Sequence, residues 1–198
     1  MGKVAFTQDP LFWRAGAISS VAVMAAILSF LTVDSLRAIA PGGSHVPRYT
    51  VINQKISYEF DAGANEWRPR IGGEELIFGH RYSAGEANAL MREGKLVLQT
   101  RACMDCHTIL GNGAYFAPDL TKAWLDPAWK TIWMPFTQKK TRAEAMAEFL
   151  MHPDRYATWN RQMPDLKIDR GEAVAMVAYL KWLSSIDTNG FPNGFGAK

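Results

Sequence analysis

Cys103-Met104-Asp105-Cys106-His107 is the most informative stretch of this chain. In Cys-x-x-Cys-His the two thiols can add to the two vinyl groups of one haem, and the adjacent imidazole reaches the iron from the same side of the ring. These are the only 2 cysteines in the sequence, so none is left for a structural disulfide. The motif therefore predicts one covalent haem c, attached through Cys103 and Cys106, with His107 as an axial ligand of the iron.

Two other uses of paired cysteines fit this sequence less well. A thioredoxin-like dithiol follows a strand and needs no histidine after it, and a zinc site needs two further ligands at matched spacing. We therefore predict haem c in preference to a redox dithiol or half of a zinc site.

The N-terminal part of the chain contains a long apolar run. Ala15–Val33 carries no charge over 19 residues, and a helix needs about 20 residues to cross the hydrocarbon layer of a membrane. Residues 12–14, Phe-Trp-Arg, precede the run, as aromatic and basic residues do at a lipid–water boundary. The pattern predicts one transmembrane helix within residues 1–40.

A cleaved signal peptide and a buried core helix are the alternatives to a retained anchor. Ala38-Ile39-Ala40 has the small-x-small pattern of a cleavage site, but Pro41 follows it directly, and the apolar run exceeds the roughly 7 to 15 residues of a signal sequence. We therefore expect the helix to be retained. Because haem c is attached outside the cytoplasmic membrane, we expect a cytoplasmic N-terminus and a periplasmic domain after about Leu36, in a bacterial inner membrane.

Residues 41–82 are predicted to form a small β-containing link between the anchor and the haem domain. Apolar and polar residues alternate through residues 51–60, VINQKISYEF, which is typical of a strand with one buried face. Arg68–Ile71 and Glu75–Phe78 flank Gly72-Gly73, a pattern that predicts a tight hairpin. No motif in this segment predicts chemistry.

The haem domain is predicted to span residues 83–198 and to be mainly α-helical. Ser83-x-x-Glu86, Thr141-x-x-Glu144 and Asp169-x-x-Glu172 have the pattern of capping boxes at the start of helices. Gly94 lies inside the first of these helices, where glycine costs about 1 kcal/mol relative to alanine, so we expect another helix to approach closely there. A helix, then the haem motif, then an aromatic-rich terminal helix is the order of a class I cytochrome c.

A six-coordinate haem needs a second axial ligand opposite His107. A methionine thioether in that position raises the reduction potential and closes the iron to external ligands. Met134 and Met163 each precede a proline. Met163 comes just before the terminal helix, in the loop that must fold over the far face of the ring, whereas a whole predicted helix still follows Met134. We favour Met163; a second histidine or an open iron site are the alternatives.

Two short segments after His107 are predicted to support it. Gly111-Asn112-Gly113 can adopt positive φ angles and turn the chain back beneath the haem. Pro118 has a fixed φ and a free carbonyl oxygen, so it can accept a hydrogen bond from His107 Nδ1 and hold the imidazole as a ligand. A simple turn proline is the alternative.

Charge and side-chain chemistry exclude other classes of function. The net charge is +3, from 22 basic and 19 acidic residues that are interspersed, and no basic helix of the kind that binds nucleic acid is present. No nucleophile with a neighbouring general base is visible. With His107 and Met163 on the iron, we expect a non-catalytic electron-transfer subunit that itself makes and breaks no substrate bond.

Three longer stretches carry a resemblance to one family. They are CMDCHTILGNGAYFAPDLTKAW from Cys103, RQMPDL from Arg161 and VAYLKWLSSIDTNGFPNG from Val177. The chain resembles the membrane-anchored cytochrome c subunit of respiratory nitric oxide reductase, over about Gly94 to Pro192 and in its single N-terminal span. The resemblance implies haem attachment (Cys103, Cys106), axial ligation (His107, Met163), a proline below the haem (Pro118) and an interfacial calcium ion (Gly113, Tyr115).

The resemblance also implies partners and a reaction. The small subunit of that family pairs with a polytopic membrane subunit that contains haem b and non-haem iron and reduces NO to N2O in denitrification. A soluble cytochrome c or cupredoxin supplies the electrons. Residues 42–82 depart from the family pattern. A subunit of an oxygen-reducing haem–copper oxidase, a free membrane-tethered carrier and a haem-based gas sensor are the alternative functions.

Overall fold

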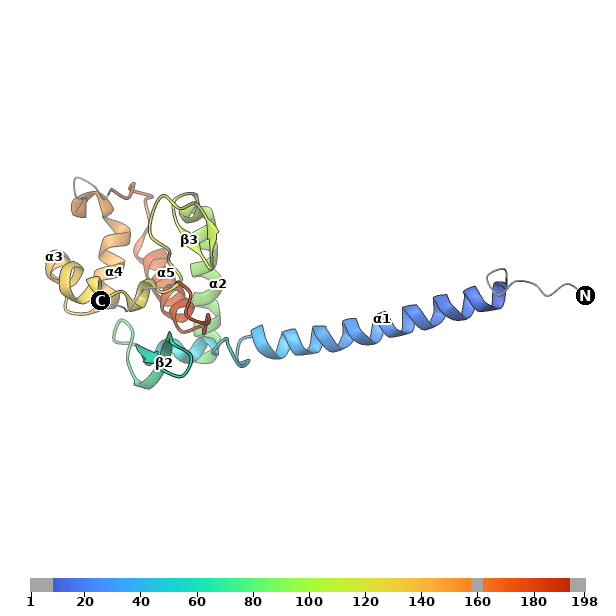
Figure 1. Ribbon diagram of the computed structural model, residues 1–198. Helices are drawn as coiled ribbons and strands as arrows, with labels where there is room; N and C mark the ends of the chain where they lie inside the picture. The colour runs from blue at the N-terminus through green and yellow to red at the C-terminus, as the bar shows by residue number, and fades with distance from the viewer. Residues whose placement is uncertain (1–8, 158–161, 193–198) are drawn as a thin grey trace, which may run out of the picture.

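The computed structural model describes residues 9–157 and 162–192 of the chain. Its first helix, α1 (Pro10–Ile39), starts after Asp9, whose side chain accepts a hydrogen bond from Leu11 N at 2.8 Å. Helix α1 projects from the folded domain as a single rod with no buried residue (Figure 1). Within the described ranges it is the one helix that is long and apolar enough to span a membrane, as the sequence predicts.

A tight turn after α1 is bonded to the rest of the domain. A Cβ on Gly43 would lie 2.3 Å from a backbone oxygen of α1, so only glycine fits there. Two hydrogen bonds connect the following residues with the terminal helix region: Asp187 N donates to His45 O, and Trp182 Nε1 donates to Pro47 O, each at 3.0 Å. The anchor thus leaves the domain at the carboxyl end of the terminal helix.

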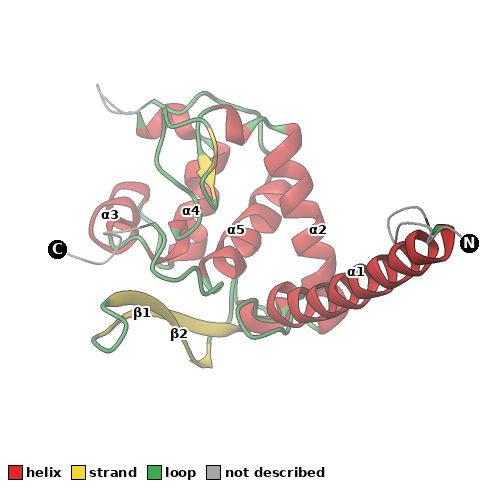
Figure 2. Cartoon of the chain, turned by 45° about the vertical axis from the view of Figure 1, so that its right-hand side comes forward, coloured by secondary structure: helices red, strands yellow, loops and turns green. Residues whose placement is uncertain are grey.

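Two packed helices form the framework of the folded domain, one in its middle and the other along one side (Figure 2). Helices α2 (Ala84–Thr100) and α5 (Arg170–Ser184) begin at two of the predicted capping boxes, and each box has both of its hydrogen bonds. They cross at Gly94, where a Cβ would lie 2.4 Å from Ala175 O. The predicted close approach at Gly94 is therefore confirmed.

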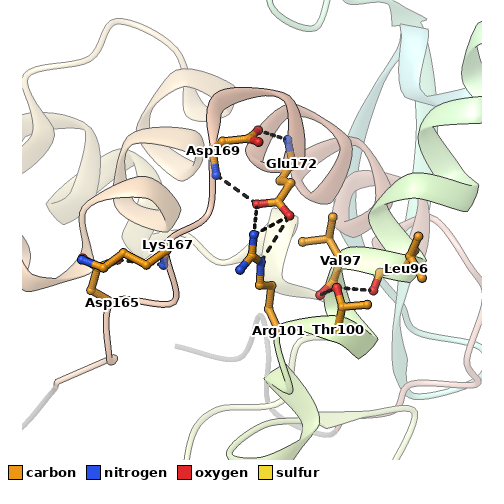
Figure 3. Close-up of polar contacts among 8 residues, drawn as sticks. All are labelled: Leu96, Val97, Thr100, Arg101, Asp165, Lys167, Asp169 and Glu172. Carbon is orange, nitrogen blue, oxygen red and sulfur yellow. Dashed lines mark hydrogen bonds and ion pairs between the residues drawn. The ribbon is translucent and has the colours of Figure 1, made fainter.

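An ion pair fixes one end of this crossing (Figure 3). Arg101 follows α2, and its Nη2 contacts the two carboxylate oxygens of Glu172 at 2.7 and 2.8 Å. Glu172 lies in the first turn of α5 and also bonds to Asp169 N at 3.0 Å. The last turn of α2 therefore meets the first turn of α5. As a result, the segment that follows α2 and the segment that precedes α5 lie at the same end of the pair.

Further helices cover α5 on the side away from α2 (Figures 1 and 2). Helix α4 (Arg142–Met151) packs on α5, and α3 (Met134–Thr137) and a π-helical turn (Trp129–Trp133) lie next to α4. The helix predicted after Thr141 is confirmed, and Thr141 caps it. Aromatic rings of this layer contact one another in a cluster made by Trp129, Trp133, Phe136, Phe149 and Tyr156.

The link between the anchor and α2 contains the predicted strand but a different hairpin. Tyr49–Asn53 form a 3-10 turn, so the strand begins later than predicted. Strand β1 (Gln54–Asp61) pairs antiparallel with β2 (Glu66–Glu74). The hairpin predicted between Arg68–Ile71 and Glu75–Phe78 is wrong, because the first of these segments pairs with β1.

Gly72-Gly73 lie inside β2 instead of forming the turn. Gln54 pairs with Glu74 and Ile56 pairs with Ile71, so β2 carries one extra residue between these pairs. This is a β-bulge, a feature that glycine accommodates as readily as a turn. Residues 66–74 pair with the longer alternating segment at residues 54–61 and not with residues 75–78. The two glycines therefore lie in a bulge within β2 and do not form a turn.

Part of the link is packed into the core of the haem domain. Ile52 and Ile77 are buried in the same apolar cluster as side chains of α2 and α5. The Asn53 side chain bonds to Tyr82 O at 2.8 Å and to Tyr82 N at 2.9 Å. These contacts connect the 3-10 turn of the link with Tyr82, which lies two residues before α2. Ile56 of β1 belongs to the same cluster, and most of the remaining hairpin extends beyond this core (Figure 2).

Candidate functional site

The Cys-x-x-Cys-His motif forms one tight turn directly after α2. Ala102 has a φ of +53°, which ends the helix, and Cys103–Asp105 form a 3-10 turn. His107 N donates to Cys103 O at 3.0 Å, so both thiols and the imidazole belong to one turn of backbone. Neither cysteine forms a disulfide. Burial raises the pKa of the Cys103 thiol.

The imidazole of His107 is oriented by a backbone carbonyl. His107 Nδ1 lies 2.7 Å from Pro118 O, which is the contact predicted from the sequence. A carbonyl can only accept, so Nδ1 carries the proton in this contact, and in the neutral imidazole Nε2 is the nitrogen that keeps its lone pair. Such a hydrogen bond fixes the ring orientation and strengthens the imidazole as a metal ligand. His107 is therefore prepared to bind a metal through Nε2.

Backbone hydrogen bonds flank this contact on both sides. Ala117 N donates to Cys106 O at 2.7 Å, and Leu120 N donates to Thr108 O at 2.8 Å. The carboxylate of Asp119 accepts a further bond from Thr108 Oγ1 at 2.6 Å. The segment around Pro118 therefore runs beside the motif and is bonded to it at several points.

A two-residue turn leads the chain from the motif toward this segment. Strand β3 (Thr108–Ile109) pairs with β4 (Asn112–Gly113), and the turn between them has φ of +49° at Leu110 and +80° at Gly111. At Gly113, φ is +120° and a Cβ would lie 2.2 Å from His107 O, so glycine is required there. The sharp turn predicted in this region is confirmed.

Met163 lies in the coil that leads into α5 and is half-buried. The ion pair between Arg101 and Glu172 brings this coil to the same end of the α2–α5 pair as the haem motif. Met134, the alternative ligand, begins α3, on the side of α4 away from α5 (Figures 1 and 2). The arrangement supports Met163, and its role as a ligand stays a prediction.

These residues fit a covalently bound haem c. Two free thiols lie three residues apart in one turn, and the next residue is a histidine whose Nδ1 is already bonded. A haem at this turn would be held by Cys103 and Cys106, with His107 and Met163 as the ligands of its iron. Such a group supplies one-electron redox chemistry.

Large apolar side chains are exposed beside the motif. Tyr115 and Phe116 are 83% and 85% exposed, and Leu110 is 48% exposed. Tyr115 OH donates to Gly111 O at 3.2 Å, so the ring lies against the turn that follows His107. We call Leu110, Tyr115 and Phe116 the motif-side patch. Exposed apolar groups that gather in this way are typical of a protein interface.

Sequence reasoning missed two buried lysines. Lys122 and Lys181 are both 0% exposed. Lys122 Nζ donates to Ser184 O at 3.3 Å and to Ile186 O, and burial lowers the pKa of Lys122 to about 8. Lys181 Nζ bonds to Glu75 Oε2 at 2.5 Å, and burial lowers the pKa of Lys181. Lys181 stands among apolar residues of the terminal helix, which could have indicated its burial, but no sequence signal indicated Lys122.

Comparisons with known proteins match the part of the chain that contains this site. A family model of cytochrome c matches residues 91–184, a range that includes the motif, Pro118 and Met163. The C subunit of nitric oxide reductase from Stutzerimonas stutzeri is 30% identical over 118 residues, which cover 60% of this chain and 75% of that protein. Its counterpart from Paracoccus denitrificans is 34% identical over 110 residues, covering 50% of this chain and 63% of that protein. The one from Cereibacter sphaeroides is 28% identical over 116 residues, covering 57% and 75%.

The similarity and the site point to the same family. The matched range contains both the crossing of α2 and α5 at Gly94 and the turn that carries His107. On these grounds the chain belongs to the family of nitric oxide reductase C subunits, and its folded domain is a cytochrome c domain for covalent haem c.

Proposed function

We propose that this chain receives electrons for a membrane nitric oxide reductase and passes them, one at a time, through a single haem c to haem b of a larger catalytic subunit. A soluble periplasmic cytochrome c or cupredoxin is the donor. In the large subunit, two NO, two electrons and two protons give N2O and water. The observation that carries the proposal is the Cys-x-x-Cys-His turn in which His107 Nδ1 is bonded to Pro118 O.

The central test uses the chain copurified from membranes with its partner. We expect a pyridine haemochrome spectrum of haem c from this chain, and NO consumption by the complex when a reduced carrier is added. The double variant Cys103→Ser/Cys106→Ser is expected to lose the covalent haem and the carrier-driven activity. A complex that consumes O2 but no NO would contradict the proposal in favour of an oxidase subunit. Isolation without any partner would favour a free tethered carrier.

The ligand pair His107 and Met163 predicts an iron that is closed to external ligands. We expect the reduced wild-type chain to show no spectral change with CO. Met163→Ala should open the sixth position and allow CO to bind. Met134→Ala is the matched control, because Met134 begins α3, and it should behave like the wild type. Strong CO binding by the wild type would favour a gas sensor.

The proposed topology has α1 crossing the inner membrane with the N-terminus in the cytoplasm. Residues 41–82 then form the periplasmic link and residues 83–198 the haem domain. Residues 1–8 and 193–198, at the two ends of this division, lie outside the described residues. Protease added to intact spheroplasts should cut within the haem domain and spare a tag at the N-terminus. Cleavage of that tag in intact spheroplasts would contradict this orientation.

The motif-side patch is the proposed contact with the large subunit. Its exposed rings support that role, and the resemblance adds a calcium ion to which Gly113 and Tyr115 contribute oxygen atoms. Calcium takes six to eight oxygen ligands, so most would belong to the partner. We expect calcium in the purified complex but not in the isolated chain, and a lower content in the complex of Tyr115→Ala. A complex free of calcium would contradict this role.

A further inference from the structure

Two buried cations lie outside the turn that carries the haem motif. Lys181 belongs to α5 and Lys122 reaches the carboxyl end of this helix, but their ammonium groups contact different parts of the molecule. Lys181 bonds to Glu75 of the link and lies over the ring of Trp124, 4.9 Å from its centroid. Lys122 bonds instead to backbone carbonyls at the end of α5. The two lysines are therefore a natural pair for comparison.

Lys122 is the last residue of a short segment that begins with Pro118. Within this segment, Asp119 Oδ1 accepts a hydrogen bond from Thr121 N at 2.7 Å. The buried Thr121 accepts a bond from Leu110 N through Oγ1 at 2.8 Å. The segment 118–122 is thus bonded along one side to the loop that follows His107.

The other attachment of this segment is the carboxyl end of α5. Lys122 Nζ donates to Ser184 O at 3.3 Å and to Ile186 O. Helix α5 ends at Ser184, and the last carbonyls of a helix have no partner within the helix. A cation is also favoured at this negative end of the helix dipole. The buried ammonium is therefore well suited to join segment 118–122 to α5.

We infer that Lys122 is a positioning residue for the haem ligand: by joining segment 118–122 to α5, it keeps the Pro118 carbonyl in place beneath His107 Nδ1. This inference rests on the proposed function, because it takes His107 as the axial ligand. The bond from Nδ1 makes the imidazole a stronger electron donor to iron, which stabilises the oxidised haem. Through this bond, Lys122 lowers the reduction potential of the haem.

Removing Lys122 has two effects of opposite sign on that potential. Loss of a buried positive charge stabilises the oxidised haem, which carries one more positive charge, and so lowers the potential. A looser bond between His107 and Pro118 weakens the ligand and raises the potential. The sign of the measured shift therefore distinguishes positioning from the effect of charge alone.

The test is Lys122→Met in the full-length, haem-loaded chain within its complex. A redox titration should show a higher potential than in the wild type, and the EPR g-values of the oxidised haem should change because the imidazole is less restrained. Lys181→Met is the matched control. It removes an equally buried cation but leaves segment 118–122 bonded, so its potential should be equal to or below that of the wild type, with unchanged g-values.

Lys122→Gln is the second variant, because its amide keeps a donor without the charge. We expect its potential to lie below that of Lys122→Met, because both variants lose the charge but the glutamine keeps part of the restraint. If the methionine variant does not accumulate, the glutamine variant decides between the two outcomes, because its potential should still lie above that of Lys181→Met. A fall, or no change, in the potential of Lys122→Met would overturn the inference, as would an equal rise in Lys181→Met or a potential of Lys122→Gln no higher than that of Lys181→Met. Haem content and NO reduction of the unmodified complex, measured in parallel, test the proposed function separately.

Discussion

The loop at residues 107–122 and the hairpin at residues 54–74 both extend from the α2–α5 pair, but they are held in different ways. The loop is bonded through buried polar side chains near its two ends, Thr108, Thr121 and Lys122, and the ammonium of Lys122 is inside the protein. The hairpin is held mainly by its own strand pairing, and its ion pair between Arg70 and Glu59 is largely exposed, with side chains 71% and 58% accessible. Buried polar bonds restrain geometry far more than exposed ion pairs do. The segment that contains the proposed iron ligand is therefore the one held by buried contacts.

The largest effect is expected from a variant that disrupts the crossing of α2 and α5, because this crossing supports both regions. In Gly94→Val the added side chain would meet Ala175 O, because even a Cβ would lie 2.4 Å from that atom. We expect a loss of about 3 kcal/mol or more in the free energy of unfolding, measured by denaturant titration of the haem-loaded chain. Gly85→Ala in the same helix is the control, since nothing lies within 4 Å of its Cβ position. Equal stability of the two variants would contradict the observed crossing.

Alkaline pH should reveal the buried ammonium of the loop. The pKa of Lys122 is about 8 in the folded state, against 10.5 for an ordinary lysine, so the unfolded chain binds more protons between these values. Stability attributable to Lys122 should therefore rise with pH across this window, by up to about 3 kcal/mol at 1.36 kcal/mol per pKa unit. Asp187 and Asp119 oppose the shift.

The measurement for Lys122 is the unfolding free energy of the wild type minus that of Lys122→Met, from pH 7 to pH 10. Taking the difference removes the contribution of tyrosines that titrate in the same range. A difference that is flat with pH would show that Lys122 keeps an ordinary pKa in the folded chain.

Within the loop, Gly113→Ala tests the contact between β4 and the motif. An alanine there must adopt a φ of +120° and place its Cβ 2.2 Å from His107 O. We expect a loss of about 2 kcal/mol and a lower yield of attached haem. Gly79→Ala is the control, because Gly79 has a φ of +72° but open space around its Cβ position. If both variants lost the same stability, backbone strain alone would explain the effect.

The smallest effect is expected in the hairpin. Arg70→Ala removes the ion pair in which Arg70 Nε lies 2.9 Å from Glu59 Oε2. Because both side chains are exposed, we expect a change below about 0.5 kcal/mol and an unaltered haem spectrum. Arg101→Ala should cost more, since the pair with Glu172 is better shielded, with side chains 32% and 18% accessible. A larger loss from Arg70→Ala would reverse the comparison.

Local patterns in the sequence predicted much of the helical framework. The capping boxes at Ser83 and Asp169 start helices because their hydrogen bonds connect residues only three positions apart. Gly94 indicated a helix crossing because glycine destabilises the interior of a helix, and the close approach of a second helix explains its presence there. The hairpin was assigned wrongly because a Gly-Gly pair suits both a turn and a bulge, and the choice depends on which strand is available for pairing.

The haem attachment motif, the apolar span and the starts of the main helices follow from the sequence alone, since each depends on residues that are neighbours along the chain. The contact of Pro118 O with His107 Nδ1 was chemically foreseeable, but only the folded backbone brings the two atoms to 2.7 Å. The partners of Lys122 lie more than sixty residues further along the chain. No local periodicity encodes such a contact. It is a product of the tertiary structure, because burial of a lysine depends on where the end of a distant helix comes to lie.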